Sequence, residues 1–357
     1  MKLVLNIGMH KTGTSAIQQT LSNYDQDGVR YLEIGHPNHS GLYSTLFMRE
    51  PWKYHAHKKN ERSEAQVQAI RSKFQIRLKE VLEKFSKDNI TTVLSSAEDI
   101  VLMDMEALTN LRNWCEQNFE RTTLVGYARP PISFLTSAIQ QRVAGGVNWN
   151  FNSLYPYYRK LFEKFDLVFG RDRVKLRRFH SSSLYKSDIV CDYLAFADVE
   201  FSPSSVKREN QSRSLQATAT LHAQRALGRG WENYPGSPIH NRILVDRLKK
   251  LGSDKIIIDE AVAKKFTEAH KQDLDWISER IGEDIYEKPQ STLTNTSDII
   301  SSKDDLLKIA GKQLPGLLDI IKEEIGDDPV DPKIVADVVD ILLEIVKQRS
   351  PRIGRRS

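Results

Sequence analysis

The chain has 357 residues, of which 39% are hydrophobic and 28% charged, and its mean hydropathy is −0.47. This composition is typical of a soluble globular protein, and no apolar run has the length of a transmembrane helix. The net charge of +5 is small and partly due to residues after 346, so we expect no nucleic-acid partner. Cys115 and Cys191 lie in apolar helical patterns, which predicts free thiols and a reducing, cytoplasmic location.

The first half of the chain alternates between strand-like and helix-like segments. Short apolar runs predict strands at residues 3–7, 92–95 and 122–127, and residues 173–179, which follow a predicted helix, are a fourth candidate strand. Helical spacing predicts helices at residues 15–23, 63–85, 105–119 and 154–169. Residues 35–59 show no clear period and predict a loop that lines a site. Strand and helix in alternation predict an α/β fold with a parallel sheet.

The composition changes after residue 288 to serine, threonine, asparagine and aspartate. We therefore predict a main domain at 1–288, a linker at 289–300, a helical extension at 301–350 and a disordered basic tail at 351–357. The last predicted helix has an apolar face made of Val335, Val338, Val339, Leu342 and Val346. This face packs on the parent domain or, in the alternative, on a second copy of the chain or another partner.

Residues 8–15 form a glycine turn between the first predicted strand and the first helix. Gly8 and Gly13 have the G-x-x-x-x-G spacing of a phosphate-binding loop, in which backbone N–H groups and a helix N-terminus face one anion. Thr14 stands where a nucleotide triphosphatase loop has lysine, and the lysine is inside the loop at Lys11. The sequence thus favours a phosphate ligand and disfavours a kinase or ATPase.

This loop resembles the 5′-phosphosulfate loop of the sulfotransferases that use 3′-phosphoadenosine 5′-phosphosulfate (PAPS), whose signature is K-x-G-T-[ST]. The resemblance implies that Lys11 contacts the phosphosulfate and its bridging oxygen, with donors supplied by Thr12, Gly13, Thr14 and Ser15. It also implies a P-loop-like three-layer fold with a central parallel sheet. No metal ion is expected, because PAPS has no γ-phosphate.

A second segment resembles the 3′-phosphate motif of the same family. Arg129 ends a predicted strand, Pro131 suits the start of a helix, and Ser137 follows Arg129 by eight positions. The resemblance implies that Arg129 and Ser137 bind the 3′-phosphate. Lys207 and Arg208 precede an Asn-x-Ser stretch similar to one that ends many sulfotransferase domains, and they are candidates for the same phosphate.

Sulfuryl transfer needs a base that removes the proton of the acceptor. Glu98 follows a predicted strand, where ligands bind in open α/β sheets. His39 and His10 are the alternatives, because histidine titrates near neutral pH. The sequence leaves the choice among Glu98, His39 and His10 open.

The segment at 35–59 contains aromatic and histidine residues suited to stacking on sugars, namely His36, Tyr43, Phe47, Trp52, Tyr54, His55 and His57. We therefore expect a carbohydrate or glycolipid acceptor with a hydroxyl or amine. In the alternative, these aromatic residues cover the edge of the sheet. Two other functions remain open. One is a P-loop kinase of a small molecule, and the other is a non-catalytic nucleotide-binding scaffold that recruits a partner through its C-terminal helices.

Overall fold

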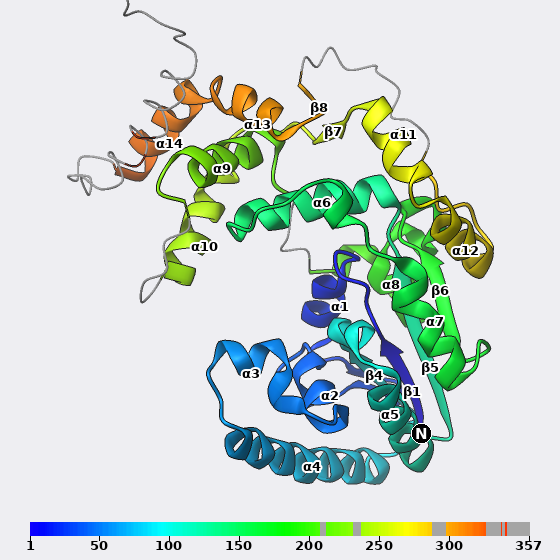
Figure 1. The fold of residues 1–357 in the computed structure, drawn as a ribbon. Helices are drawn as coiled ribbons and strands as arrows, with labels where there is room; N and C mark the ends of the chain where they lie inside the picture. Colours follow the sequence, from blue (N-terminus) through cyan, green and yellow to red (C-terminus); the bar gives the residue numbers. More distant parts are fainter. Residues whose placement is uncertain (208–211, 231–236, 288–297, 326–336, 338–339, 341–357) are drawn as a thin grey trace, which may run out of the picture. The chain divides into compact units, whose positions relative to one another are not determined.

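The computed structural model describes all residues except 208–211, 231–236, 288–297, 326–336, 338–339 and 341–357 (Figure 1). The chain forms two compact units. The first comprises Met1–Pro131, Pro156–Asn210 and His270–Tyr286, and the second comprises Ile132–Tyr155, Gln211–Ala269 and Glu287–Ser357.

The first unit contains a six-stranded sheet with the order β2-β3-β4-β1-β5-β6. Its strands are β1 (Lys2–Asn6), β2 (Asp25–Gln26), β3 (Val29–Tyr31), β4 (Thr92–Ser96), β5 (Arg121–Ala128) and β6 (Val174–Arg178). All neighbouring pairs are parallel except β2 and β3, so the sheet is mixed but mostly parallel. The prediction of a parallel sheet is confirmed in its main part, and the short antiparallel edge was not predicted.

The order of the strands places a topological switch at β1. The chain passes from β1 outward to β3, returns to β4, and then crosses to β5 on the other side of β1. In open α/β sheets, ligands bind at the carboxyl ends of the strands next to such a switch. The loops that follow β1, β4 and β5 are therefore the first place to look for a site.

Helices cover both faces of the sheet, as Figure 1 shows for the first unit. They are α1 (Thr14–Leu21), α2 (Ser40–Phe47), α3 (His55–Lys59), α4 (Glu64–Lys87), α5 (Met105–Asn118), α7 (Tyr158–Phe169), α8 (Ile189–Ala195) and α12 (Lys271–Ile281). Helices α1 and α8 pack with Val4, Leu94 and Val125 on one face. On the other face, α5 contacts both α2 and α7.

Short 3₁₀ helices occur between the main elements of the first unit. They are η1 (Pro51–Lys53), η2 (Glu98–Leu102), η4 (Ser181–Ser183), η5 (Tyr185–Ser187) and η6 (Pro203–Ser205). Cys115 on α5 and Cys191 on α8 are buried free thiols, as predicted.

The second unit is mainly helical. It contains α6 (Pro131–Ala144), α9 (Leu215–Leu227), α10 (Ser237–Leu248), α11 (Glu260–Glu268), α13 (Lys303–Ala310), α14 (Leu314–Ile325) and the 3₁₀ helix η3 (Asn152–Leu154). Strands β7 (Ile257–Ile258) and β8 (Ile299–Ile300) form a small parallel pair that was not predicted. Among the helices of the described ranges, none is long and apolar enough to cross a membrane.

The prediction of a loop at residues 35–59 is wrong, because α2, η1 and α3 occupy much of this segment. In α2, seven residues from Ser40 to Phe47 are buried, among them three polar ones, so the helix has no solvent-exposed face. A helix buried on most sides lacks the 3.6-residue alternation by which helices are predicted.

The predicted boundary at residue 288 stays a prediction. Most of the predicted linker lies outside the described residues, and β8 forms its last part. Helices α13 and α14 lie in the predicted helical extension. The predicted apolar face from Val335 to Val346 and the basic tail lie outside the described residues.

Candidate functional site

The loop after β1, residues 8–15, turns the chain into α1; we call it the Lys11 loop. Its backbone is left-handed at Gly8, Lys11 and Gly13, whose φ angles are 84°, 67° and 75°. Glycine adopts this conformation without strain, whereas the surrounding structure must hold Lys11 in it. Such non-glycine residues concentrate at binding and catalytic sites, which makes this loop a candidate binding segment.

Gly8 allows the Lys11 loop to approach the segment after β4. A Cβ atom at Gly8 would lie 2.9 Å from the carbonyl oxygen of Glu98 and 3.0 Å from its Cα, too close for a side chain. Asn6 accepts the N–H of Gly8 through Oδ1 at 3.2 Å and donates from Nδ2 to the hydroxyl of Ser96 at 3.0 Å. The loop and Glu98 are therefore held side by side.

The hydroxyl groups of the Lys11 loop differ in their partners. Thr12 is buried and donates to the carbonyl oxygen of Met9 at 2.5 Å. Thr14 is also buried, but its Oγ1 has no hydrogen-bond partner among the described residues. Ser15 is exposed. The N-cap residue of α1 is Gly13, which has no side chain to cap the free N–H groups of the helix. A buried hydroxyl without a partner beside an uncapped helix N-terminus favours binding of an anion.

Arg129 follows β5 and links the second predicted motif to the Lys11 loop. Its Nη1 donates to the carbonyl oxygen of Lys11 at 2.7 Å, and its guanidinium carbon lies 5.8 Å from the centre of the Phe179 ring. Its own carbonyl oxygen accepts the hydroxyl of Tyr158 at 2.5 Å. Two predicted phosphate-binding residues, 118 positions apart, thus lie together at the carboxyl ends of β1 and β5.

Two acidic residues after β4 contact the side chain of His10. The Nδ1 atom of His10 lies 3.6 Å from Oε2 of Glu98, and its Nε2 atom lies 3.5 Å from Oδ1 of Asp99. Asp99 also accepts the hydroxyl of Tyr54 at 2.6 Å and lies 2.8 Å from Nε2 of His55. We call these five residues the carboxyl-end cluster.

The two carboxylates favour the protonated form of His10. The pKa of His10 is raised above 6.5, mainly by its hydrogen bond with Glu98 and further by the negative charges of Glu98 and Asp99, which together outweigh the opposing effect of burial. The pKa of Tyr54 is also raised, first by burial and then by its hydrogen bond to Asp99. The side chains of His10 and Glu98 are 41% and 26% exposed, so a substrate can reach both.

His39 lies in the interior instead. Its ring is buried, and its Nδ1 lies 2.8 Å from the hydroxyl oxygen of Ser95, which also accepts the hydroxyl of Tyr43 at 3.0 Å. The hydroxyl of Tyr193 accepts the backbone N–H of Ser95 at 3.2 Å, and we call these four residues the buried network. Burial lowers the pKa of His39 to about 3, so its imidazole is neutral at pH 7.

The aromatic residues expected to stack on a sugar are partly internal. Tyr43 and Phe47 are buried and pack on Trp114, with ring centres 6.2 and 5.6 Å away. The expectation of an aromatic sugar platform is therefore wrong for these two residues, which cover the sheet. Tyr54 and His55 contact Asp99 in the carboxyl-end cluster.

Three further residues are predicted to contact the 3′-phosphate. Ser137 is a half-buried residue of α6, in the second unit. Lys207 is exposed, and its backbone N–H donates to the hydroxyl of Thr20 on α1 at 3.0 Å. Arg208 lies outside the described residues.

Sequence reasoning missed several members of the site. The sequence predicts no role for Asp99 beside Glu98 and predicts Asn6 only as part of a strand, although both hold groups in the site. An acidic pair directly after a strand was the signal available for Asp99. Asn38 also contacts the site, because its Nδ2 lies 3.5 Å from Oε1 of Glu98, but no sequence pattern indicates this contact.

Comparisons with known proteins give no relative on which to base a function. No model of a protein family matches the chain, and no curated protein matches it significantly. We therefore infer the function from the site itself.

Proposed function

We propose that the chain is a PAPS-dependent sulfotransferase with a P-loop-like fold. The observation that carries the proposal is the hydrogen bond from Arg129 to the carbonyl of Lys11, because it joins the two segments that resemble the nucleotide-binding motifs. The unpartnered hydroxyl of Thr14 adds support, since a phosphate or sulfate oxygen would satisfy it. The proposed acceptor is a hydroxyl or amine of a carbohydrate or glycolipid, and the proposed location is the cytoplasm.

In the proposed reaction the acceptor oxygen or nitrogen attacks sulfur, and the bond from sulfur to the 5′-phosphate oxygen breaks. Negative charge grows on that oxygen, and Lys11 stabilises it by its ammonium group. The product nucleotide is adenosine 3′,5′-bisphosphate. Arg129, Ser137, Lys207 and Arg208 are the proposed ligands of its 3′-phosphate, by the resemblance described above.

We assign the role of base to Glu98. Both ring nitrogens of His10 lie near carboxylates, which favours the imidazolium form, and an imidazolium has no lone pair to accept a proton. His39 is excluded from contact with an acceptor by burial. Glu98 then takes the proton of the acceptor, and protonated His10 adds positive charge beside the Lys11 loop.

The test is transfer of labelled sulfate from PAPS to a mixture of oligosaccharides and glycolipids. We expect transfer by the unmodified chain and a loss of at least about 100-fold for Lys11→Ala, the effect of removing one preorganised charge-stabilising donor. Lys87→Ala, at an exposed lysine of α4, is the matched control and should keep full activity.

Two results would replace the proposal. Magnesium-dependent transfer of phosphate from ATP, with no use of PAPS, would indicate a kinase. Nucleotide binding without any transfer, together with loss of a partner on deletion of the residues after 290, would indicate a scaffold.

A further inference from the structure

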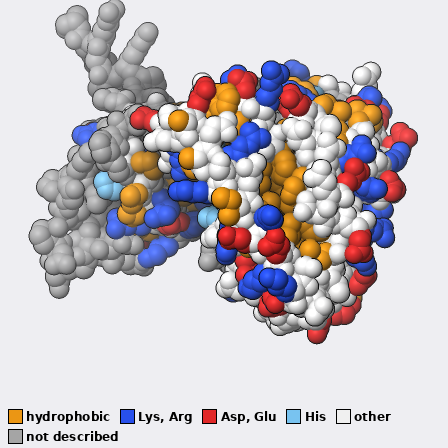
Figure 2. All heavy atoms as spheres, turned by 90° about the horizontal axis from the view of Figure 1, so that it is seen from below, with side chains coloured by type: hydrophobic (Ala, Val, Ile, Leu, Met, Phe, Trp, Pro, Cys, Tyr) orange, Lys and Arg blue, Asp and Glu red, His pale blue; other side chains and the backbone are white. Residues whose placement is uncertain are grey.

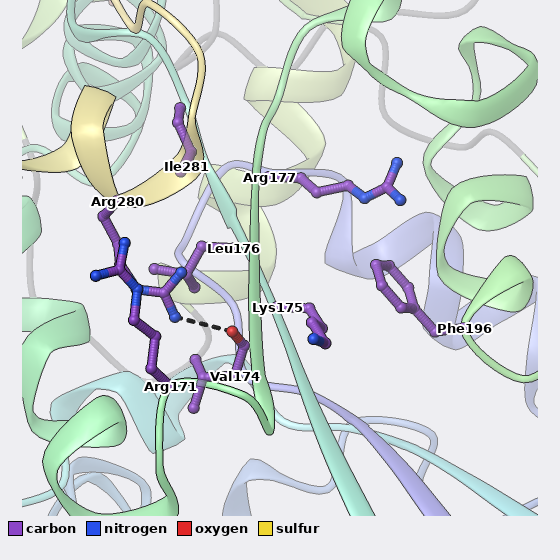
Figure 3. A pocket seen from close by; sticks show the side chains of 8 residues that line it. All are labelled: Arg171, Val174, Lys175, Leu176, Arg177, Phe196, Arg280 and Ile281. Atoms are coloured by element: carbon purple, nitrogen blue, oxygen red, sulfur yellow. Dashed lines mark hydrogen bonds between the residues drawn. The ribbon is translucent and has the colours of Figure 1, made fainter.

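A pocket of about 260 Å³ lies along β6, an edge strand of the sheet in the first unit. Its lining includes four cationic side chains, Arg171, Lys175, Arg177 and Arg280, together with Phe196 (Figure 3). In Figure 3, Arg171 and Arg280 lie on one side of the strand, and Lys175, Arg177 and Phe196 lie on the other. We call this the β6 pocket.

Two of the four cations are fixed by ion pairs. Arg280 contacts both carboxylate oxygens of Asp166, at 2.6 and 2.7 Å, and also donates to the carbonyl oxygen of Val174 at 2.8 Å. Arg177 donates to Asp192 at 2.8 Å, and its guanidinium carbon lies 4.9 Å from the centre of the Phe196 ring. These contacts hold the walls of the pocket in place before any ligand binds.

The other two cations are not neutralised. Arg171 is exposed and Lys175 is half-buried, and in the part of the chain that the structure describes neither forms an ion pair. By contrast, acidic and basic side chains are intermixed over the right-hand part of the face shown in Figure 2. Two uncompensated cations beside two fixed ones thus make the pocket a local centre of positive charge.

The strand gives these cations a regular arrangement. Lys175 and Arg177 are two positions apart on β6, so they lie on the same face and about 7 Å apart along the strand. A ligand that carries anionic groups at intervals matches this arrangement better than a single small anion. The carboxyl end of β6 leads to Phe179, whose ring lies against Arg129, about 13 Å along the strand from Lys175.

We propose that the β6 pocket binds sulfate or carboxylate groups of a polyanionic carbohydrate chain. This inference rests on the proposed function, in which a carbohydrate is the acceptor. A chain anchored in the pocket would follow β6 towards the carboxyl ends of the strands, where the Lys11 loop lies. The pocket therefore selects acceptors that already carry negative charge and holds them by a part remote from the reacting group.

The experiment measures binding of fluorescein-labelled dextran sulfate to the full chain by anisotropy, at several salt concentrations. The test variant is Arg171→Gln with Lys175→Gln, which removes the two uncompensated cations. The control is Lys73→Gln with Lys87→Gln, which removes two exposed lysines of α4 and so changes the net charge equally. We expect the test variant to lose at least about tenfold in affinity and the control less than about twofold.

Four outcomes would overturn the inference. They are equal losses in the test and control variants, equal binding of unsulfated dextran, displacement of the polymer by inorganic sulfate at the same concentration of sulfate groups, and tighter pocket-dependent binding of a DNA oligonucleotide. The binding assay needs no PAPS. A chain that binds dextran sulfate through the pocket but does not use PAPS would contradict the proposed function alone, and active enzyme without pocket-dependent binding would contradict the inference alone.

Discussion

The carboxyl-end cluster and the buried network both adjoin β4, yet they place histidine in opposite environments. His10 lies between Glu98 and Asp99, and its pKa is raised. His39 lies beside Ser95 in the interior, and its pKa is lowered to about 3. Ser95 and Glu98 are only three positions apart. The charged, accessible carboxyl-end cluster and the neutral buried network are therefore neighbours in the sequence.

The difference shows that residues beyond the end of β4 and residues in the interior beside it have different roles. Side chains beyond the end of β4 reach solvent and a substrate, and they can hold charge. In the interior, Ser95 of the strand joins His39, Tyr43 and Tyr193 by hydrogen bonds between neutral groups. Substitutions in the cluster should therefore change function first, and substitutions in the network should change stability first.

The largest effect is expected at Glu98. Glu98→Gln keeps the shape of the side chain but removes the base, so turnover should fall by about 10²- to 10⁴-fold. Binding of adenosine 3′,5′-bisphosphate should not change. The pKa of His10, followed by NMR, should fall because its main partner loses its charge.

Glu106→Gln, at an exposed glutamate of α5, is the matched control and should have normal turnover. Normal turnover in Glu98→Gln would show that Glu98 is not the base of the reaction.

Gly8 is the next test, because it brings the Lys11 loop against Glu98. Gly8→Ala adds a Cβ atom 2.9 Å from the carbonyl oxygen of Glu98 at a φ of 84°, whereas Gly35→Ala adds one at a φ of 82° with no atom within 4 Å. Gly35→Ala should lower the free energy of unfolding by about 1 kcal/mol, the strain of the positive φ. Gly8→Ala should lower it by about 1–3 kcal/mol more. Equal losses in urea unfolding would show that the close approach does not matter.

A substitution at Thr14 should weaken nucleotide binding without lowering the stability of the fold. Thr14→Val removes a buried hydroxyl without a partner, so the free energy of unfolding should stay the same or rise by up to about 1 kcal/mol. Binding of the bisphosphate should weaken about tenfold, the effect of one lost charge-assisted hydrogen bond. Thr220→Val, at a buried unpartnered hydroxyl of α9, is the control and should leave nucleotide affinity unchanged. Unchanged affinity in both variants would exclude the Thr14 hydroxyl from the site.

The smallest effect on function and the clearest effect of pH are expected at His39. Its pKa in the folded state, about 3, is below the unfolded value of 6.5, so the unfolded state takes up a proton first as the pH falls. The free energy of unfolding should then decrease on acidification below pH 6.5, by up to about 1.4 kcal/mol per pH unit. His39→Gln should reduce this slope in urea titrations between about pH 6 and pH 4. An unchanged slope would show that His39 does not titrate in this way.

The sequence predicted those features that depend on neighbouring residues. Strands β1, β4 and β5 contain short apolar runs, β6 alternates apolar and basic residues, and the Lys11 loop is a compact motif with glycines at two of its three left-handed positions. Helix α2 was missed because burial on most sides removed its period. The contact of Asp99 with Tyr54 spans 45 positions, and the β6 pocket joins Lys175 to Arg280, so tertiary folding alone brings these groups together.

The central claim is that the Lys11 loop and Arg129 bind a nucleotide with both a 5′- and a 3′-phosphate. Calorimetric titration of the purified chain with adenosine 3′,5′-bisphosphate, adenosine 5′-monophosphate and magnesium ATP tests it most directly. We predict that the bisphosphate binds at least about tenfold more tightly than the monophosphate, without magnesium, and that Arg129→Gln removes this preference. No binding of the bisphosphate, or tighter binding of magnesium ATP, would contradict the claim.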